Sequence, residues 1–214
     1  MDGVLIDSQP MHYEIDIRVL KSCGFEASLE TVTPFTGMSN PDRWPKYKEV
    51  LGLANSTGEL IKLAEEKMRE VFDSTNFSVS AGLIEFLKGL NEMGVKCAVA
   101  SSSSHELIEL VLNRTGIKKY FDVLVSGEDV RYGKPSPDIY LKAVKAVGLP
   151  VEKCIAIEDA APGVLAAKRA GLYCICYKNP NTANQDFAHA DFVLTHFNEG
   201  LCAINRVKTT RGFL

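Results

Sequence analysis

The chain has 214 residues, 46% of them hydrophobic, and its 27 acidic and 24 basic residues leave a net charge of −3. This length allows one large domain or a domain with an insertion, and a core that needs neither disulfides nor a structural metal. The balanced charge argues against nucleic-acid and membrane-surface partners, because both require a concentrated basic face. No stretch approaches the roughly 18 apolar residues of a membrane-spanning helix, so we expect a cytoplasmic protein.

The six cysteines are scattered along the chain, with no CxxC pair and no Cys/His cluster at zinc spacing. Four of them lie in β-like apolar runs, where cysteine behaves as a small buried hydrophobe: Cys97, Cys154, Cys174 and Cys176. We therefore expect reduced core cysteines without a redox role.

Residues 10–79 carry helix-period stretches and no convincing strand. The periodicity predicts helices over Met11–Ser22 and Thr57–Ser74. We interpret this segment as a helical domain inserted after the phosphate-side loop of the first βα unit of a larger core domain, which would comprise residues 1–9 and 80–214.

In the larger domain, short β-rich runs alternate with helical patterns. The runs are Lys96–Ser101, Asp122–Ser126, Cys154–Glu158, Tyr173–Tyr177 and Asp191–Thr195. The helical patterns are Leu83–Met93, His105–Thr115, Ser136–Val147 and Pro162–Ala170. Because strands that alternate with helices form parallel sheets, the sequence predicts a doubly wound α/β fold.

Polar residues stand where the apolar runs end, and in a doubly wound sheet the ligand site lies beyond these carboxyl ends. Ser101 ends one run, Glu158 and Asp159 close another, Asp2 stands near the start, and Lys134 lies in the loop GKPSPD. Carboxylates bind a hard cation, while lysine and hydroxyl groups contact phosphate oxygens. The set therefore suits a phosphate held with Mg²⁺.

Each of these residues also has a purely structural explanation. Asp159 could cap the following helix, and Glu158 could be a solvated strand end. Ser101 could be one of four turn-forming serines, and Lys134 a surface charge. Adjacent carboxylates that close an apolar strand repel each other, however, which favours a cation beside the pair.

The ordered motifs DGVLIDS, VASSSS, GKPSPDIY and IEDAAPGVLAAKRAG carry a family resemblance. The chain resembles the haloacid dehalogenase superfamily of phosphotransferases, specifically its β-phosphoglucomutase-like branch with a helical cap. The resemblance covers nearly the whole chain, and it implies that residues 10–79 are the cap domain.

The resemblance implies roles for the charged residues of the core domain. Asp2 matches the family's general acid/base, whose backbone carbonyl also ligates the metal. Glu158 and Asp159 match the acidic Mg²⁺-binding pair. Lys134 matches the lysine that neutralises the phosphate and the nucleophile.

The resemblance also implies a phosphate-binding loop. Ser101 matches the hydroxyl that holds the transferring phosphate, with the Ser102 amide and Ser103 beside it. His12 matches a histidine that many members of this branch carry on the first cap helix. The implied cofactor is Mg²⁺, and the implied partner is a small phosphorylated metabolite.

One part of the family pattern is missing from the 214 residues. The family's nucleophile is the first aspartate of D-x-D-G, and only Met1-Asp2-Gly3 is present here. The nucleophile, and the central strand that presents it, would stand immediately before Met1. We expect that Met1 is an internal residue of a longer reading frame. The alternative is a truncated, catalytically inactive relative that binds a phosphorylated metabolite.

The cap sequence bears on the choice between a phosphatase and a mutase. A mutase must hold a bisphosphorylated intermediate by its non-reacting phosphate, preferably through a bidentate arginine. Asn40 occupies the position where β-phosphoglucomutases place that arginine, although Arg43 lies three residues on and Lys67 matches a cap lysine. We therefore favour a monomeric phosphatase for a small phosphorylated sugar, with the mutase as the alternative.

Overall fold

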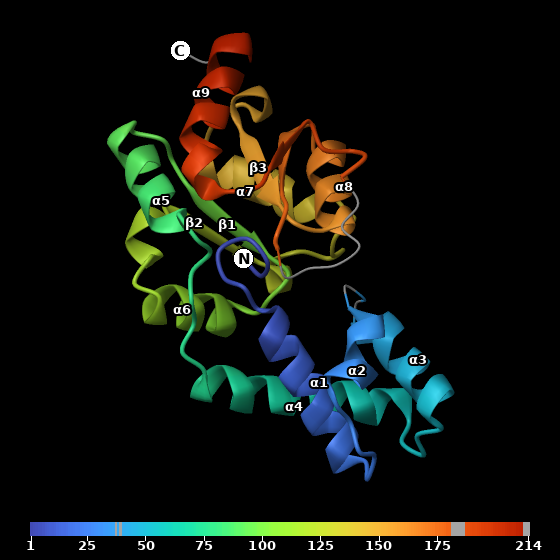
Figure 1. The fold of residues 1–214 in the computed structure, drawn as a ribbon. Coiled ribbons are helices and arrows are strands. Elements are labelled where there is room, and N and C mark those ends of the chain that lie inside the picture. Colours follow the sequence, from blue (N-terminus) through green and yellow to red (C-terminus); the bar gives the residue numbers. More distant parts are fainter. Residues whose placement is uncertain (37, 39, 181–186, 212–214) are drawn as a thin grey trace. The chain divides into compact units, whose positions relative to one another are not determined.

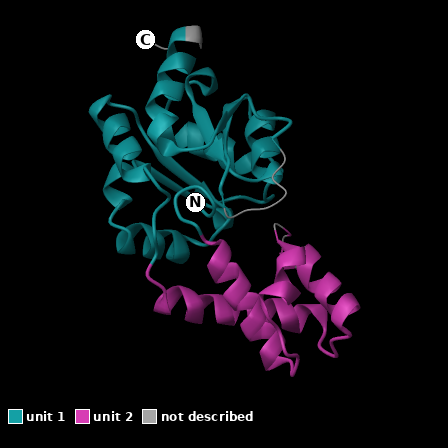
Figure 2. Ribbon diagram, viewed as in Figure 1, with its two compact units in different colours: residues 1–7, 77–180, 185–214 teal, residues 8–76, 181–184 magenta. Residues whose placement is uncertain are grey.

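The computed structural model describes residues 1–36, 38, 40–180 and 187–211 (Figure 1). These residues form two compact units (Figure 2). The core unit comprises Met1–Asp7, Phe77–Pro180 and residues 187–211, and the helical unit comprises Ser8–Asn76. That the helical unit acts as a cap stays a prediction.

The core unit contains five parallel strands in two hydrogen-bonded ladders. They are β1 (Ala98–Ser101), β2 (Val123–Ser126), β3 (Ile155–Glu158), β4 (Tyr173–Tyr177) and β5 (Phe192–Leu194). One ladder pairs β1 with β2, and the other has the order β3-β4-β5. The parallel α/β fold is thus confirmed. Within the described residues β1 and β3 lie in separate ladders, whereas the absence of a central strand between them stays a prediction.

Helices cover both faces of these strands (Figure 1). They are α5 (Leu83–Glu92), α6 (His105–Arg114), α7 (Asp138–Val147), α8 (Ala161–Arg169) and α9 (Gly200–Arg211), with short 3₁₀ turns η2 (Lys118–Tyr120), η3 (Gly127–Asp129), η4 (Val151–Lys153) and η5 (Phe197–Glu199). One apolar cluster joins α5, α6 and α9 to the strands through residues such as Phe86, Val99 and Ile175. A second joins α7 and α8 to them through Ile139 and Val125. Each cluster draws on both ladders, so the core unit has a single three-layer core.

The helical unit has its own apolar core. Its elements are α1 (Gln9–Ser22), α2 (Leu29–Val32), η1 (Thr33–Phe35), α3 (Asn40–Leu51) and α4 (Thr57–Ser74). Helix α4 packs against α1 and α3, and Ile15, Leu60 and Phe72 are buried. Ser56 and Glu59 form a capping box at the start of α4, which satisfies amide groups that the first helical turn leaves unpaired. No strand occurs in the described part of this unit, as predicted.

The cysteines are all free thiols. Cys174 and Cys176 are buried in β4 as predicted, but Cys97 and Cys154 are only partly buried, because each directly precedes the regular part of its strand. Among the described helices, none is both long and apolar enough to cross a membrane.

Candidate active site

Lys134 joins the carboxyl ends of β1 and β3. Its Nζ lies 2.5 Å from Glu158 Oε1 and donates a second hydrogen bond of 3.2 Å to the Ala100 carbonyl. The ammonium also lies 5.1 Å from the centre of the Tyr140 ring, which adds a cation–π contact. The structure therefore brings the predicted lysine and the first acid of the predicted pair into direct contact.

Glu158 is held from three sides. Besides Lys134, its Oε1 accepts a hydrogen bond from the buried Tyr140 hydroxyl. Gly163, in the first turn of α8, lies so close that a Cβ there would be 2.2 Å from Glu158 Cδ. Burial would raise the pKa of Glu158, but the Lys134 ammonium holds that pKa below its ordinary value. The carboxylate is therefore ionised and fixed in orientation.

Asp159 experiences the opposite electrostatic effect. Burial, followed by the neighbouring charge of Glu158, raises the pKa of Asp159 to about 7. The Gly3 backbone packs against this carboxylate: Gly3 has φ +67°, and a Cβ there would lie 1.8 Å from Asp159 Oδ2. Only glycine fits this close approach without strain. The turn that carries Asp2 is thus fixed against the second acid.

The four consecutive serines at the end of β1, residues 101–104, which we call the serine loop, reach Asp2. Ser103 Oγ donates a hydrogen bond of 3.1 Å to Asp2 Oδ2, and the Ser103 amide donates one of 3.2 Å to Ser101 Oγ. Ser101 is buried, whereas Ser102 is exposed. Asp2, Ser101, Ser103, Lys134 and the acidic pair therefore converge in the core unit, at the carboxyl ends of β1 and β3.

The site can be tested for its fit to Mg²⁺. Among the described residues, no three His, Cys, Asp or Glu side chains form a group that could hold a metal ion. Mg²⁺, however, usually binds one or two carboxylates and retains water and substrate oxygens as further ligands. Asp2 Oδ1 is buried without a hydrogen-bond partner, and the raised pKa of Asp159 indicates that added positive charge would be favourable there. The oxygen donors of this site fit the cation.

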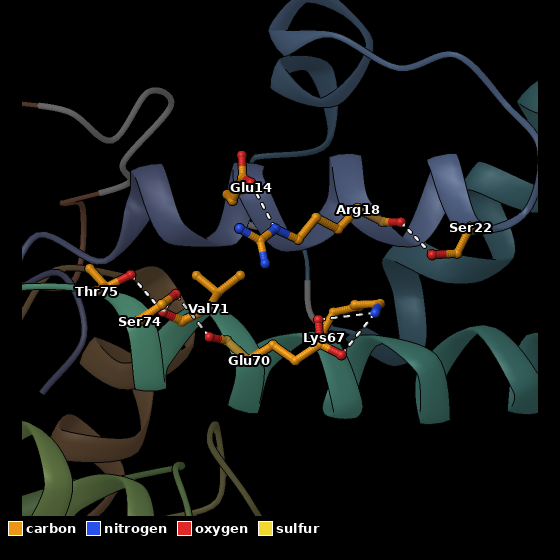
Figure 3. A network of polar contacts seen from close by, with 8 residues as sticks. All are labelled: Glu14, Arg18, Ser22, Lys67, Glu70, Val71, Ser74 and Thr75. Carbon is orange, nitrogen blue, oxygen red and sulfur yellow. Dashed lines mark hydrogen bonds and ion pairs between the residues drawn. The ribbon is translucent and has the colours of Figure 1, made fainter.

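The other three predicted residues, His12, Arg43 and Lys67, belong to the helical unit. His12 lies half-buried on α1. Lys67 pairs with Glu70 one turn along α4, with Nζ 2.8 Å from Glu70 Oε1; Figure 3 shows the two side chains facing each other. Gly37 and Ser39, which shortly precede Asn40 in the sequence, lie outside the described residues.

Arg43 is buried in an ion pair. Its Nη2 lies 3.3 Å from Asp16 Oδ1 and donates a hydrogen bond of 2.6 Å to Asn40 Oδ1. The Tyr47 hydroxyl donates to the other Asp16 oxygen at 2.9 Å. Only 9% of the Arg43 side chain and 3% of the Asp16 side chain are exposed. Arg43 is therefore neutralised within the helical unit by an acid that the sequence analysis did not single out.

Asp16 should make the stability of the helical unit depend on pH. Burial raises the pKa of Asp16 from 3.8 to about 6, despite the opposing effects of Arg43 and Tyr47. Between about pH 4 and about pH 6 the folded protein retains a proton on Asp16 that the unfolded chain loses. The contribution of Asp16 to the free energy of unfolding therefore falls as pH rises through this range. At about 1.4 kcal/mol per pKa unit, the fall is roughly 3 kcal/mol.

Urea unfolding of the parent and Asp16→Asn at several pH values checks this prediction. The asparagine does not titrate, so the variant should gain stability relative to the parent as pH rises from about 4 to about 6. Glu14→Gln, a change to an exposed acid of the same helix, is the control for general charge effects. A constant difference between the Asp16→Asn variant and the parent would contradict the prediction.

Three residues of the core unit were missed by sequence reasoning. Tyr140 holds Glu158, Asn179 Nδ2 donates a hydrogen bond of 3.0 Å to the Gly3 carbonyl, and Ser126 Oγ donates one of 2.7 Å to the Ser103 carbonyl. Ser126 ends β2, and Asn179 follows the end of β4 by two residues. The rule that located Ser101 and Glu158 at strand ends could therefore have found both. Tyr140 lies within a helix and gave no such signal.

Comparisons with known proteins agree with this fold. Residues 1–171 match the haloacid dehalogenase-like hydrolases. A phosphorylated carbohydrates phosphatase of Thermotoga maritima is 33% identical over 172 residues, which cover 80% of this chain and 79% of that protein. Hexitol phosphatase B of Escherichia coli strain K12 is 29% identical over 204 residues, 93% of this chain and 90% of that protein.

A solved structure extends the similarity to the whole fold. The crystal structure of a candidate β-phosphoglucomutase from Thermotoga maritima has a TM-score of 0.78 to this chain at 29% identity. The match covers 97% of this chain and 96% of that one. The fold and the sequence matches together define a hydrolase whose core is a parallel α/β sheet. The chain belongs to the haloacid dehalogenase-like hydrolase family, as the sequence motifs implied.

Proposed function

We propose that this protein is a Mg²⁺-dependent phosphatase that hydrolyses small phosphorylated sugars or related metabolites. The main support is the contact of Lys134 with Glu158 beside a serine loop, which places a cation and hydroxyl groups at one sheet edge. The named activities of two relatives, on phosphorylated carbohydrates and on hexitol phosphates, favour the same substrate class.

The reaction proceeds in two phosphoryl transfers. In the mechanism that the family resemblance implies, a carboxylate nucleophile attacks phosphorus and displaces the sugar oxygen, which takes a proton from the Asp2 carboxyl group. Asp2, now ionised, then takes a proton from water as the water attacks the aspartyl phosphate and releases inorganic phosphate. Lys134 and the serine loop hold the phosphate oxygens in line for both transfers.

Glu158, Asp159 and the Asp2 carbonyl would hold Mg²⁺, which would neutralise negative charge on the phosphoryl oxygens. We expect Asp159→Ala to weaken Mg²⁺ binding about tenfold or more, because the variant removes a carboxylate ligand. Calorimetric titration of Mg²⁺ into the parent and the variant measures this directly. An unchanged affinity would exclude Asp159 as a ligand.

The environment of Arg43 favours a phosphatase over a mutase. A mutase requires a cationic clamp for the non-reacting phosphate, and the Arg43 guanidinium already pairs with Asp16 and Asn40. A clamp with a buried carboxylate beside it would attract a phosphate dianion only weakly, because the carboxylate neutralises the charge. The solved structure of a candidate β-phosphoglucomutase keeps the mutase as the alternative.

Product analysis distinguishes the two functions. The chain, preceded by an apolar strand that ends in aspartate, should release inorganic phosphate from hexose and hexitol monophosphates. With β-glucose 1-phosphate and a trace of the bisphosphate, it should give free phosphate or no product. Efficient formation of glucose 6-phosphate would overturn the phosphatase proposal and make Arg43 or Lys67 the clamp.

A further inference from the structure

Ser126 lies beside the serine loop without being part of it. It ends β2 directly opposite Ser101 in the β1–β2 ladder and is fully buried. Its hydroxyl donates a hydrogen bond of 2.7 Å to the Ser103 carbonyl and accepts one of 3.1 Å from the Glu128 amide. The hydroxyl therefore caps its own turn as an acceptor and connects that turn to the serine loop as a donor.

The turn after β2 makes further contacts with the same loop. Glu128 Oε2 accepts a hydrogen bond of 3.0 Å from the His105 amide, and Asp129 Oδ2 lies 2.9 Å from His105 Nε2. Gly127 packs so closely that a Cβ there would lie 2.6 Å from the Ser102 carbonyl oxygen. Residues 126–129, which we call the bracing turn, thus contact the serine loop and the first residue of α6.

These contacts set the orientation of the loop's peptide groups. The carbonyl oxygens of Ser102 and Ser103 both approach the bracing turn. In a planar trans peptide the carbonyl and the next amide N–H point in opposite directions, so the amides of Ser103 and Ser104 are directed away from the turn, and the Ser103 amide donates to Ser101 Oγ. Amide groups that share a direction in this way form an anion-binding arrangement.

We propose that Ser126 is a positioning residue, which fixes the Ser103 carbonyl so that the serine loop presents its amide and hydroxyl groups to a phosphate. Ser126 itself need not contact the phosphate. This inference rests on the proposed function, because it assigns the serine loop to phosphate binding. It deepens that function by naming a residue on β2 that controls phosphate affinity.

The test compares Ser126→Ala with Lys142→Ala. The first variant removes the donor to Ser103. The second removes the exposed lysine that pairs with Asp129 Oδ1 at 3.1 Å, and it leaves the Ser126–Ser103 hydrogen bond in place. Calorimetry measures the affinity of the full chain for inorganic phosphate in Mg²⁺ and, separately, for Mg²⁺ alone. Urea unfolding reports stability.

We expect Ser126→Ala to weaken phosphate binding about tenfold, as the loss of a buried hydrogen bond at a binding loop would, with Mg²⁺ affinity unchanged. Lys142→Ala should bind phosphate as the parent does. Ser126→Thr, which keeps the hydroxyl, should restore affinity. In a catalytically active version, Ser126→Ala should raise KM more than it lowers kcat.

Phosphate affinity within twofold of the parent in a folded Ser126→Ala variant would overturn the inference. An equal loss of Mg²⁺ and phosphate binding would also overturn it, because that pattern indicates a general structural role. If Ser126→Ala does not fold, the isosteric Ser126→Cys, a weaker donor, should show an intermediate loss of affinity. If the version preceded by a strand that ends in aspartate binds phosphate but hydrolyses no ester, the proposed function is refuted, and the phosphate affinities of the parent and Ser126→Ala still test Ser126.

Discussion

A version of this chain preceded by an apolar strand that ends in aspartate is expected to hydrolyse phosphomonoesters more than about a thousandfold faster than the 214-residue chain. The 214 residues carry Asp2, to which we assign proton transfer in the proposed function, but not the first aspartate of the family's D-x-D-G motif. Direct attack by water lacks the in-line carboxylate that divides the reaction into two easier steps. Phosphate release by the two versions measures the difference.

The same comparison tests the central strand. Within the described residues β1 and β3 are not paired with each other, and an added strand could hydrogen-bond to both edges. The extended version should therefore melt at a higher temperature, since each added backbone hydrogen bond contributes about 1 kcal/mol. The control is the extended version with asparagine in place of the added aspartate. This control should keep the higher melting temperature and lose activity.

Equal activity and equal melting temperature in the two versions would contradict both expectations. Another segment would then supply the strand and the nucleophile, and the match of Asp2 to the family's second aspartate would be wrong. Intact-mass analysis of the natural protein shows which version the cell contains. A natural product that begins at Met1 and hydrolyses no ester would support the inactive, metabolite-binding alternative.

Periodicity predicted the regular elements of the fold well, and two of its boundary errors have a common cause. Helix α4 and strand β4 have the predicted bounds, Thr57–Ser74 and Tyr173–Tyr177. The runs predicted to begin at Asp122 and Asp191 each begin one residue later. In both cases the aspartate side chain accepts a hydrogen bond from the backbone of the neighbouring strand, at Cys97 and Cys174. Hydropathy alone does not reveal this side-chain capping.

The site was predictable where the strands carry its residues and less so where packing brings them together. The carboxyl-end rule located Ser101, Glu158 and Asp159 from the sequence. The Arg43–Asp16 pair joins residues 27 positions apart through the packing of the helical unit, which no local pattern encodes. The hydrogen bond from Tyr140 to Glu158 likewise depends on tertiary packing, because α7 packs against β1 and β2 while Glu158 ends β3.

Replacement of Lys134 should reduce both stability and activity, and the two effects can be separated. Lys134 and Glu158 have side chains only 14% and 8% exposed, with Nζ 2.5 Å from Oε1. Lys134→Ala leaves a buried carboxylate without its cation, and loss of one partner of such a pair costs about 3 kcal/mol or more in the free energy of unfolding. In the catalytically active version, turnover should fall about a hundredfold or more, because the phosphate also loses its cation.

The double variant Lys134→Ala/Glu158→Gln separates these effects. A neutral amide in place of Glu158 removes the uncompensated charge, so the double variant should recover much of the lost free energy of unfolding. It should recover no activity, since the phosphate still lacks the lysine and the metal site now lacks one carboxylate. Urea unfolding and phosphate release on the four proteins of this cycle provide the measurement. A double variant no more stable than Lys134→Ala would show that the lysine does not stabilise the fold through Glu158, and recovered activity would remove Lys134 from the catalytic site.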